Sequence, residues 1–196
     1  MKTRDRILDT ALRLFNESGT AAVTTNHIAD ALGMSPGNLY YHFRNKDEII
    51  RALFEQLFAL WDQLFDLPPD RAPTLADIER LVRANFAVTF DYRFIYRELI
   101  ALLRRDQLLG RRWVEIRTRG FAGFRELIDG FGAAGVIVAP HDDDELTRIA
   151  ELCWLVSEFW PANVEVSGKA LDAAQVERGI ALLLQVLKPY IVASDI

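Results

Sequence analysis

The stretch that decides the fold is Thr24–Lys46, which reads TTNHIADALGMSPGNLYYHFRNK. Its pattern predicts two short helices joined by a tight turn. Thr24 or Thr25 can cap the N-terminus of the first helix, because a hydroxyl accepts a hydrogen bond from a free backbone N–H there. Gly33 stands where a left-handed residue is needed to end that helix. The first helix is therefore only about two turns long.

The second predicted helix begins after Ser35, an N-cap residue, and has Pro36 at its first position, where a missing N–H costs no hydrogen bond. Leu39 and Phe43 lie four residues apart and face inward. The exposed residues suit nucleic acid, because glycine admits close backbone approach, an amide can bond base edges, and hydroxyl and imidazole groups can donate to phosphates. These exposed residues are Gly37, Asn38, Tyr40, Tyr41 and His42. We interpret the stretch as a DNA-reading unit.

Two flanking helices complete this unit. The preceding helix covers about Arg4 to Ser18, has one apolar face and ends at Gly19. The following helix starts at the capping pair Asn45 and Glu48 and continues for about 20 residues, or ~30 Å. Such a helix can carry rigid motion from one end to the other.

The rest of the chain reads as further helices, so the predicted fold class is all-α. A Pro-rich loop is expected at 67–73, and the run 132–140 resembles a strand but has no visible pairing partner, so it is interpreted as loop. Pro161 is expected to end a helix. The predicted helices cover about 74–91, 94–109, 110–131, 141–160 and 169–190.

Composition excludes several classes of protein. The chain has 196 residues, of which 51% are hydrophobic, and no apolar run approaches the ~18 residues of a membrane span. No signal peptide is visible at the N-terminus, so a cytoplasmic protein without membrane association is expected. Cys153 is the single cysteine, which excludes an intramolecular disulfide.

The net charge of −5 argues against a wholly basic nucleic-acid binder. Residues 1–50 carry six basic and six acidic residues, so the whole excess of negative charge lies beyond them. A DNA contact that uses few cations and several neutral donors is weaker and depends less on salt than a basic arm does.

The N-terminal quarter, about residues 3–55, resembles the tetracycline-repressor (TetR) family of bacterial transcription regulators. The run Gly-Asn-Leu-Tyr-Tyr-His-Phe after a Gly-x-Ser-Pro turn is highly specific for this resemblance. The residues that carry it are Ile7, Ala11, Leu14, Phe15, Gly19, Thr24, Thr25, Ile28, Ala29, Leu32, Gly33, Ser35, Gly37, Asn38, Leu39, Tyr40, Tyr41, His42, Phe43, Lys46 and Ile49. Beyond residue 55 only the segment 92–99 has a general likeness to the family, and it indicates no particular ligand.

The resemblance implies an all-α homodimer with a variable C-terminal ligand domain, which releases operator DNA when a ligand binds. It divides the chain into a helix-turn-helix DNA-binding domain at 1–46 and a helical ligand-binding and dimerisation domain at 47–196. It also implies phosphate contacts for Thr25, Tyr40, Tyr41, His42 and Lys46, and base contacts for Gly37 and Asn38. Thr24, Ser35 and Pro36 complete the predicted DNA-binding set.

Two positions depart from the family pattern. Pro36 stands where the family often has a lysine, so one phosphate or base contact is missing. Asn26-His27 replaces the more usual charged pair at the start of the first helix of the motif. Both departures concern specificity rather than membership.

Two candidate chemical sites have simpler explanations. The run His141–Glu145 resembles a cluster of ligands for a hard metal, but consecutive carboxylates on a helix point in different directions and suit capping better. We expect no metal or cofactor. Cys153 lies in an apolar segment and is expected to be an inert buried thiol rather than a redox sensor.

A ligand pocket is the least defined prediction, because aromatic residues at helical spacing are more often plain core. Glu158 lies on an otherwise apolar helix and needs a partner if buried, for which Arg97, Arg104 or a ligand cation is available; a solvated outer face is the alternative. The candidate pocket residues are Phe58, Trp61, Phe86, Phe90, Trp113, Phe124, Trp154 and Glu158.

The sequence thus predicts a transcriptional repressor that a small, mainly apolar or aromatic effector releases from double-stranded operator DNA. The expected homodimer forms through the helices at 142–160 and 169–190. An activator or co-repressor-dependent regulator of the same family is one alternative. A helical binding protein or enzyme with an incidental helix-turn-helix is the other, but the sequence offers no paired catalytic carboxylates and no activated nucleophile.

Overall fold

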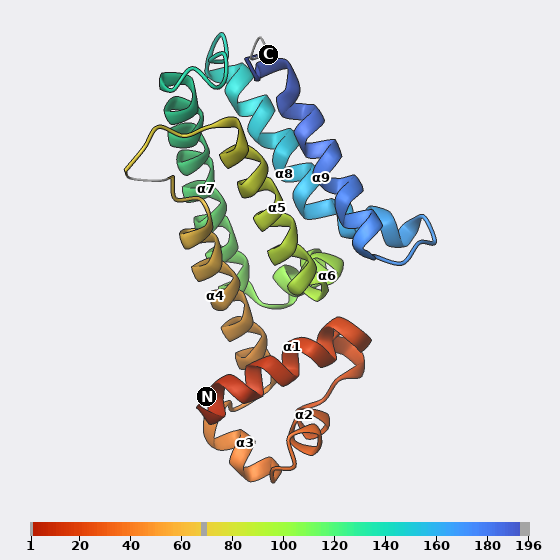
Figure 1. Cartoon of the computed structure of the whole chain (residues 1–196). Coiled ribbons are helices and arrows are strands. Elements are labelled where there is room, and N and C mark those ends of the chain that lie inside the picture. Colours follow the sequence, from red (N-terminus) through yellow and green to blue (C-terminus); the bar gives the residue numbers. More distant parts are fainter. Residues whose placement is uncertain (1, 68–69, 193–196) are drawn as a thin grey trace. The chain divides into compact units, whose positions relative to one another are not determined.

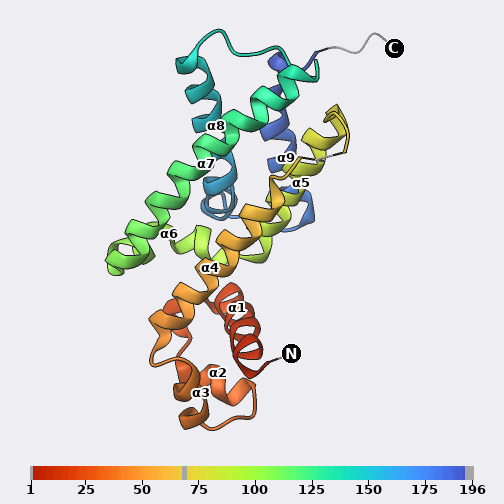
Figure 2. The same ribbon diagram turned by 90° about the vertical axis from the view of Figure 1, so that its left-hand side faces the viewer.

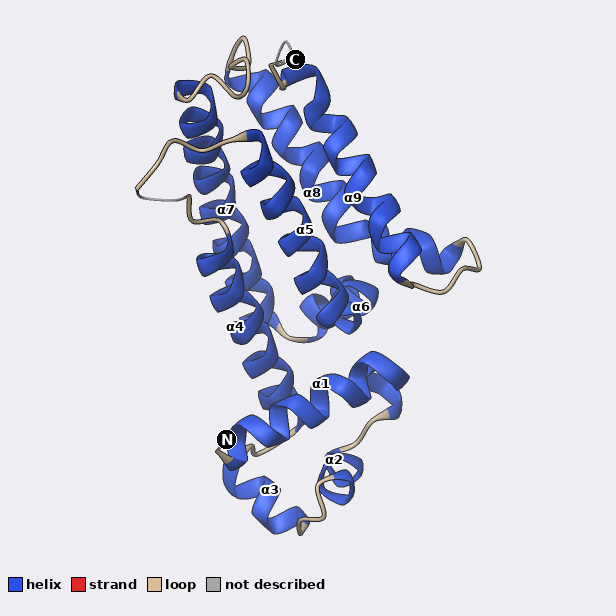
Figure 3. Cartoon of the chain, in the orientation of Figure 1, coloured by secondary structure: helices blue, strands red, loops and turns tan. Residues whose placement is uncertain are grey.

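The computed structural model describes residues 2–67 and 70–192, and within them the chain is helical (Figures 1 and 3). This confirms the all-α fold class. The helices are α1 (Thr3–Ala22), α2 (Thr25–Ala31), α3 (Pro36–His42), α4 (Lys46–Leu64), α5 (Leu75–Asp91), α6 (Arg93–Arg105), α7 (Gln107–Ala133), α8 (Asp143–Val166) and α9 (Ala173–Leu187), followed by a short 3₁₀ turn at Lys188–Tyr190.

Three predicted boundaries are wrong. The sixth and seventh helices are separated at Asp106 rather than at Gly110, because the Asp106 carboxylate accepts hydrogen bonds from the N–H groups of Leu108 and Leu109. Pro161 lies inside α8 instead of ending it. The last helix starts after Asp172, whose carboxylate accepts from Gln175 N, and not near 169.

In the strand-like run at 132–140, the first two residues are the end of α7 and residues 134–140 are loop, as expected, but this loop does have a pairing partner. Ile137 and Ile191 form an isolated antiparallel bridge, in which Val138 N donates to Tyr190 O at 2.7 Å and Val192 N donates to Val136 O at 3.0 Å. The predicted Pro-rich loop includes Pro68 and Pro69, which lie outside the described residues.

Contacts divide the chain into two compact units. The N-terminal unit comprises Met1–Leu60 and Asp91–Trp113, and so contains α6 and most of α4 in addition to α1–α3. Within it α2 and α3 lie next to each other (Figure 2). Its core is built from α1, α4 and α6, and Phe15 of α1 meets Phe94 of α6 with ring centroids 5.3 Å apart. These units are defined by contacts and not by function. The predicted boundary at residue 46, between a DNA-binding domain and a ligand-binding domain, stays a prediction.

The C-terminal unit comprises Trp61–Phe90 and Val114–Ile196. Within it α8 and α9 run side by side, and Trp160 Nε1 of α8 donates to Gln175 O of α9 at 2.7 Å (Figure 1). Its apolar core takes side chains from α5, α7, α8 and α9, including Phe86, Phe131, Ile149 and Ile180. In the described part of the chain, no helix is both long enough and apolar enough to cross a membrane.

Candidate nucleic-acid interface

The helix-turn-helix is fixed by caps that are local in sequence. The Thr24 hydroxyl accepts a hydrogen bond from His27 N at 3.2 Å, and the Ser35 hydroxyl accepts one from Asn38 N at 3.3 Å. Gly33 has a φ of 63°, the left-handed conformation that the turn requires. The two predicted N-caps and the glycine turn are therefore confirmed, with Thr24 rather than Thr25 as the cap of α2.

One face of this motif is buried and the other is open. Ile28, Ala29 and Leu39 are completely buried, which fixes α2 and α3 on the rest of the N-terminal unit. Tyr41 is 85% exposed, and a Cβ placed on Gly37 would meet no atom within 4 Å. The outer face of α3 therefore presents an exposed aromatic ring, an uncovered backbone and the exposed side chain of Asn38.

Two side-chain contacts organise the open face. The hydroxyl of Tyr40 lies 3.1 Å from the hydroxyl of Thr25, which ties the start of α2 to the middle of α3. The rings of Tyr41 and His42 meet edge to face with centroids 5.2 Å apart. Such contacts hold donors in place before any ligand binds, which lowers the entropy cost of binding.

Lys46 makes contacts that the sequence did not predict. Its ammonium donates to Thr20 O at 2.5 Å and to Val23 O at 2.9 Å, at the end of α1. The expected phosphate contact of Lys46 competes with these two bonds, because only one of its three N–H donors is left.

Two further contacts of this region were missed. His27 Nδ1 accepts a hydrogen bond from Thr24 N at 3.4 Å, so the unusual His27 completes a capping box. The guanidinium of Arg4 lies 4.8 Å from the centre of the Phe43 ring. The capping box could have been predicted, because Thr24 and His27 are three residues apart. The contact of Arg4 with Phe43 could not, because it joins distant parts of the chain.

The predicted pocket residues are divided between the two units. Phe58 and Trp113 are buried in the N-terminal unit, with ring centroids 5.9 Å apart. Phe86 is buried in the core of the C-terminal unit, and Trp61 and Phe90 are partly buried there. Burial in these cores favours the simpler explanation for Phe58, Phe86 and Trp113.

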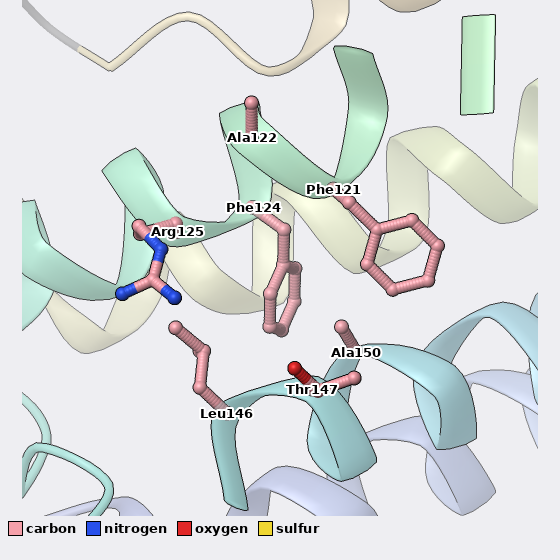
Figure 4. Close-up of a pocket in the computed structure, with 7 residues that line it drawn as sticks. All are labelled: Phe121, Ala122, Phe124, Arg125, Leu146, Thr147 and Ala150. Carbon is pink, nitrogen blue, oxygen red and sulfur yellow. The ribbon is translucent and has the colours of Figure 1, made fainter. Parts of the chain in front are cut away.

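A groove of about 200 Å³ lies between α7 and α8 in the C-terminal unit, and Phe124 is the predicted pocket residue that lines it (Figure 4). Trp154 is not among the lining residues but contacts two of them: its ring stacks on Phe121 with centroids 4.4 Å apart and meets the Phe124 ring edge to face with centroids 5.8 Å apart. The lining residues are Phe121, Ala122, Phe124, Arg125, Leu146, Thr147 and Ala150.

The sequence left two alternatives for Glu158, burial with a partner or a solvated outer face. Its side chain is only 5% exposed, so the first alternative is correct. Its partner is Arg117 of α7, a residue that the sequence did not single out. Burial raises the pKa of the Glu158 carboxyl, and the charge and hydrogen bond of Arg117 oppose that rise.

A capped helix-turn-helix with an open, donor-rich second helix defines a DNA-binding regulator, and the comparisons with known proteins agree. The chain belongs to the TetR family: residues 47–195 match the family described as "Bacterial transcriptional repressor", and residues 7–53 match "Bacterial regulatory proteins, tetR family". Proteins of this family are transcriptional regulators rather than enzymes.

Individual relatives support the same assignment. A TetR-family regulator from Marinobacter aquaeolei VT8 is 37% identical and has a TM-score of 0.88, covering 98% of this chain and 92% of that one. A transcriptional regulator from Saccharomonospora viridis in complex with choline is 19% identical, with a TM-score of 0.76 and coverage of 97% and 98%, and shows the fold alone.

Among curated proteins, the chain is similar to the transcriptional repressor KstR2 of Rhodococcus jostii RHA1, with 38% identity over 87 residues. That alignment covers 42% of this chain and 41% of the relative. The chain thus spans about two fifths of the length of this curated relative.

Proposed function

We propose that the protein is a ligand-responsive repressor, which binds operator DNA as a homodimer through the exposed face of α3. The observation that carries the proposal is the combination of an 85% exposed Tyr41 with the uncovered backbone of Gly37. Gly37 and Asn38 approach base edges, while Thr25, Tyr40, Tyr41 and His42 donate to phosphates. Thr24, Ser35 and Pro36 shape the helix ends that carry these groups.

A single copy of this surface binds weakly, because the first 50 residues have no net charge. Two copies held at a fixed spacing bind far more tightly than one, since the second contact becomes intramolecular. In a dimer that reads adjacent major grooves, the two α3 helices are about 34–36 Å apart. Affinity therefore depends on dimerisation.

The proposed dimer interface is the outer face of α8 and α9. Leu155 is 54% exposed, Leu152 is 48% exposed and Leu182 is 39% exposed, so apolar area on both helices is available for a four-helix bundle. Sedimentation tests this: the parent should be a dimer at micromolar concentration, and Leu155→Arg should be a folded monomer. Ile100→Arg, an equally exposed change on α6, should remain dimeric, and a monomeric parent would refute the interface.

The proposed effector is small and mainly apolar or aromatic, and the α7–α8 groove supports this class. A cavity of ~150 Å³ can hold benzene, so the groove of about 200 Å³ between α7 and α8 can accommodate one substituted ring. Aromatic compounds that raise the melting temperature of the parent should do so less for Phe124→Ala. If every such compound acts equally on both proteins, Phe124 is not part of the effector site.

Gel shift with a duplex selected by the parent from a random pool tests the DNA-binding surface. Tyr41→Ala and Asn38→Ala should each weaken binding about thirtyfold, because each loses one contact of ~1 kcal/mol in both copies of the dimer. Phe65→Ala, which truncates an exposed ring of the C-terminal unit, should bind like the parent. Parent-like binding by both α3 variants would refute the assignment.

The direction of regulation is a separate measurement. A reporter with the selected duplex placed over a promoter should be silenced by the parent and released by an effector. Stimulation of the reporter would support the activator alternative, and silencing that requires the effector would support the co-repressor alternative.

A further inference from the structure

Helix α1 is interrupted one turn before its end. Gly19 has a φ of 77° and a ψ of 161°, which are not helical values. In an unbroken helix the N–H of Thr20 would donate to the carbonyl of Asn16, four residues earlier. The break frees this donor and this acceptor in a part of the chain where Thr20 is 1% exposed and Asn16 is 7% exposed. Buried free backbone groups are costly, so each requires another partner.

Side chains of α6 take both groups. Thr20 N donates to Glu98 Oε1 at 2.8 Å, and Arg97 Nη1 donates to Asn16 O at 2.8 Å. The Thr20 hydroxyl donates to the second Glu98 oxygen at 2.5 Å. Two neighbouring residues of α6 thus replace the helical hydrogen bond between Thr20 N and Asn16 O.

The Asn16 side chain completes the connection in the opposite direction. Its amide nitrogen donates to Asp91 O at 2.7 Å, and its amide oxygen accepts from Phe94 N at 3.0 Å. Phe94 N is in the first turn of α6, where no helical partner exists and where the N-cap residue Tyr92 provides no side-chain bond. Asn16 therefore caps α6 from another helix.

The break in α1 also explains why residue 19 is a glycine. A Cβ at residue 19 would lie 3.0 Å from Glu98 Oε1, and the positive φ is strained for any other residue type. Glycine allows the carboxylate to approach the turn closely enough to bond Thr20.

The same short segment is bound to α4 as well. Lys46, the first residue of α4, donates to Thr20 O and Val23 O, and Val23 directly precedes the cap of α2. Thr20 is thus held by α6 through its N–H and hydroxyl, and by α4 through its carbonyl. The segment that leads into the helix-turn-helix has little freedom to move independently of these two helices.

We infer that Glu98 is a positioning residue for DNA binding: its hydrogen bonds to Thr20 across the Gly19 break set where α2 and α3 begin. Arg97 and Asn16 assist it. α6 follows α5 after the single residue Tyr92. This role rests on the proposed function of α3 in reading DNA.

The test compares full-length Glu98→Ala and Glu98→Gln on the duplex selected by the parent. Alanine leaves Thr20 N without its acceptor and should weaken duplex binding about tenfold, the equivalent of one to two hydrogen bonds. Glutamine retains an acceptor for the N–H and a group that can donate to the hydroxyl, so it should bind within about threefold of the parent. Glu17→Ala, which removes an exposed carboxylate of α1 bonded only to Arg13 in the described contacts, should match the parent.

Amide hydrogen exchange separates positioning from general stability. In Glu98→Ala, exchange should accelerate at residues 20–31, while the core amides of α8 around Ile149 keep their protection. Thr20→Val, which loses only the hydroxyl bond, gives a milder second variant and should fall between the parent and Glu98→Ala, whereas Thr20→Ser should match the parent.

The inference fails if Glu98→Ala binds DNA like the parent, or if glutamine is as damaging as alanine, because the carboxylate geometry would then have no specific role. It also fails if exchange rises throughout the chain. Failure of the proposed function has a different signature: Tyr41→Ala would then bind like the parent, yet Glu98→Ala would still accelerate exchange at residues 20–31.

Discussion

The guanidinium of Arg117 donates to the carboxylate of Glu158 inside the C-terminal unit, where Glu158 is 5% exposed. This ion pair joins α7 to α8, and Arg117 also lies 5.9 Å from the centre of the ring of Phe121, which lines the groove. A buried pair of this kind offsets its own desolvation only while both partners are present. The stability of the unit should therefore depend on pH through Glu158.

Glu158→Gln tests this dependence. Because burial raises the native pKa of Glu158 above the ordinary value of 4.5, its proton binds more tightly to the native state. The resulting stabilisation is present below pH 4.5 and is lost as the pH rises through the raised native pKa. Glutamine does not titrate, so the variant lacks this loss. As the pH rises, the free energy of unfolding of Glu158→Gln should therefore increase relative to that of the parent, by about 1.4 kcal/mol for each pH unit by which the native pKa of Glu158 is raised. Urea unfolding at acidic and neutral pH measures the difference.

Arg117→Met is the complementary variant. It leaves a buried carboxylate without its donor, so it should destabilise the protein by about 2 kcal/mol at neutral pH and by less at acidic pH, where the carboxyl is protonated. This account would be contradicted if Arg117→Met lost the same free energy of unfolding at every pH and if the difference in free energy of unfolding between Glu158→Gln and the parent did not change with pH.

Local features of the fold were predictable from the sequence, and contacts between distant residues were not. The Thr24 and Ser35 caps and the Gly33 turn depend on neighbours within three residues, so their chemistry is visible in the sequence. Asp106 ends α6 and starts α7 while it also pairs with Arg51 at 2.9 Å, a contact across 55 residues that no local pattern indicates.

Pro161 shows tertiary packing overriding a local signal. A proline in a helix interior costs ~3 kcal/mol, which is why the sequence predicted an end there. Val164, one turn later, is 1% exposed, and Trp160 is bonded to α9, so burial of this last turn compensates for the lost hydrogen bond. The candidate DNA-binding residues were predictable because they share one short motif, whereas pocket residues depend on how separate helices pack.

Lys46→Met distinguishes an internal role from a phosphate contact. A lysine that neutralises a phosphate contributes about 0.9 to the slope of log affinity against log salt concentration. Since the Lys46 ammonium already donates to Thr20 O and Val23 O, we expect the slope to stay unchanged while the melting temperature falls. Arg44→Met, an exposed change two residues earlier in the chain, should leave the melting temperature unchanged. A slope reduced in magnitude by about 1.8, which is 0.9 from each copy of the dimer, at constant melting temperature would support the phosphate contact instead.

Cys153 should be unreactive in the native protein. Burial raises the pKa of its thiol to about 12, so at pH 8 roughly one thiol in 10⁴ is ionised. A thiol reagent should label the native protein no faster than the C-terminal unit opens, and should label it rapidly and stoichiometrically in denaturant. Complete labelling of the native protein within minutes would contradict the buried position of this residue and support the redox-sensor alternative.

Gly179 of α9 has less room for an added Cβ than any other described glycine of the C-terminal unit. A Cβ at this position would lie 2.4 Å from Phe86 Cε1 and 2.7 Å from Trp160 Cδ1. Neither ring can yield easily, because Phe86 is buried in the core and Trp160 is held by its hydrogen bond to Gln175 O. Gly179→Ala should therefore destabilise the protein by about 2 kcal/mol, despite the better helix propensity of alanine.

Gly123 of α7 is the matched control, since it lies in a helix of the same unit and a Cβ there would meet no atom within 4 Å. Gly123→Ala should stabilise the protein by about 0.5–1 kcal/mol, because alanine loses less backbone entropy in a helix. The two substitutions add the same methyl group, so opposite signs in urea unfolding isolate the effect of close packing between α5, α8 and α9. Equal changes of either sign would mean that α9 can move away from Phe86 without loss, and the close contact at Gly179 would then have no role in fixing the position of α9 within the unit.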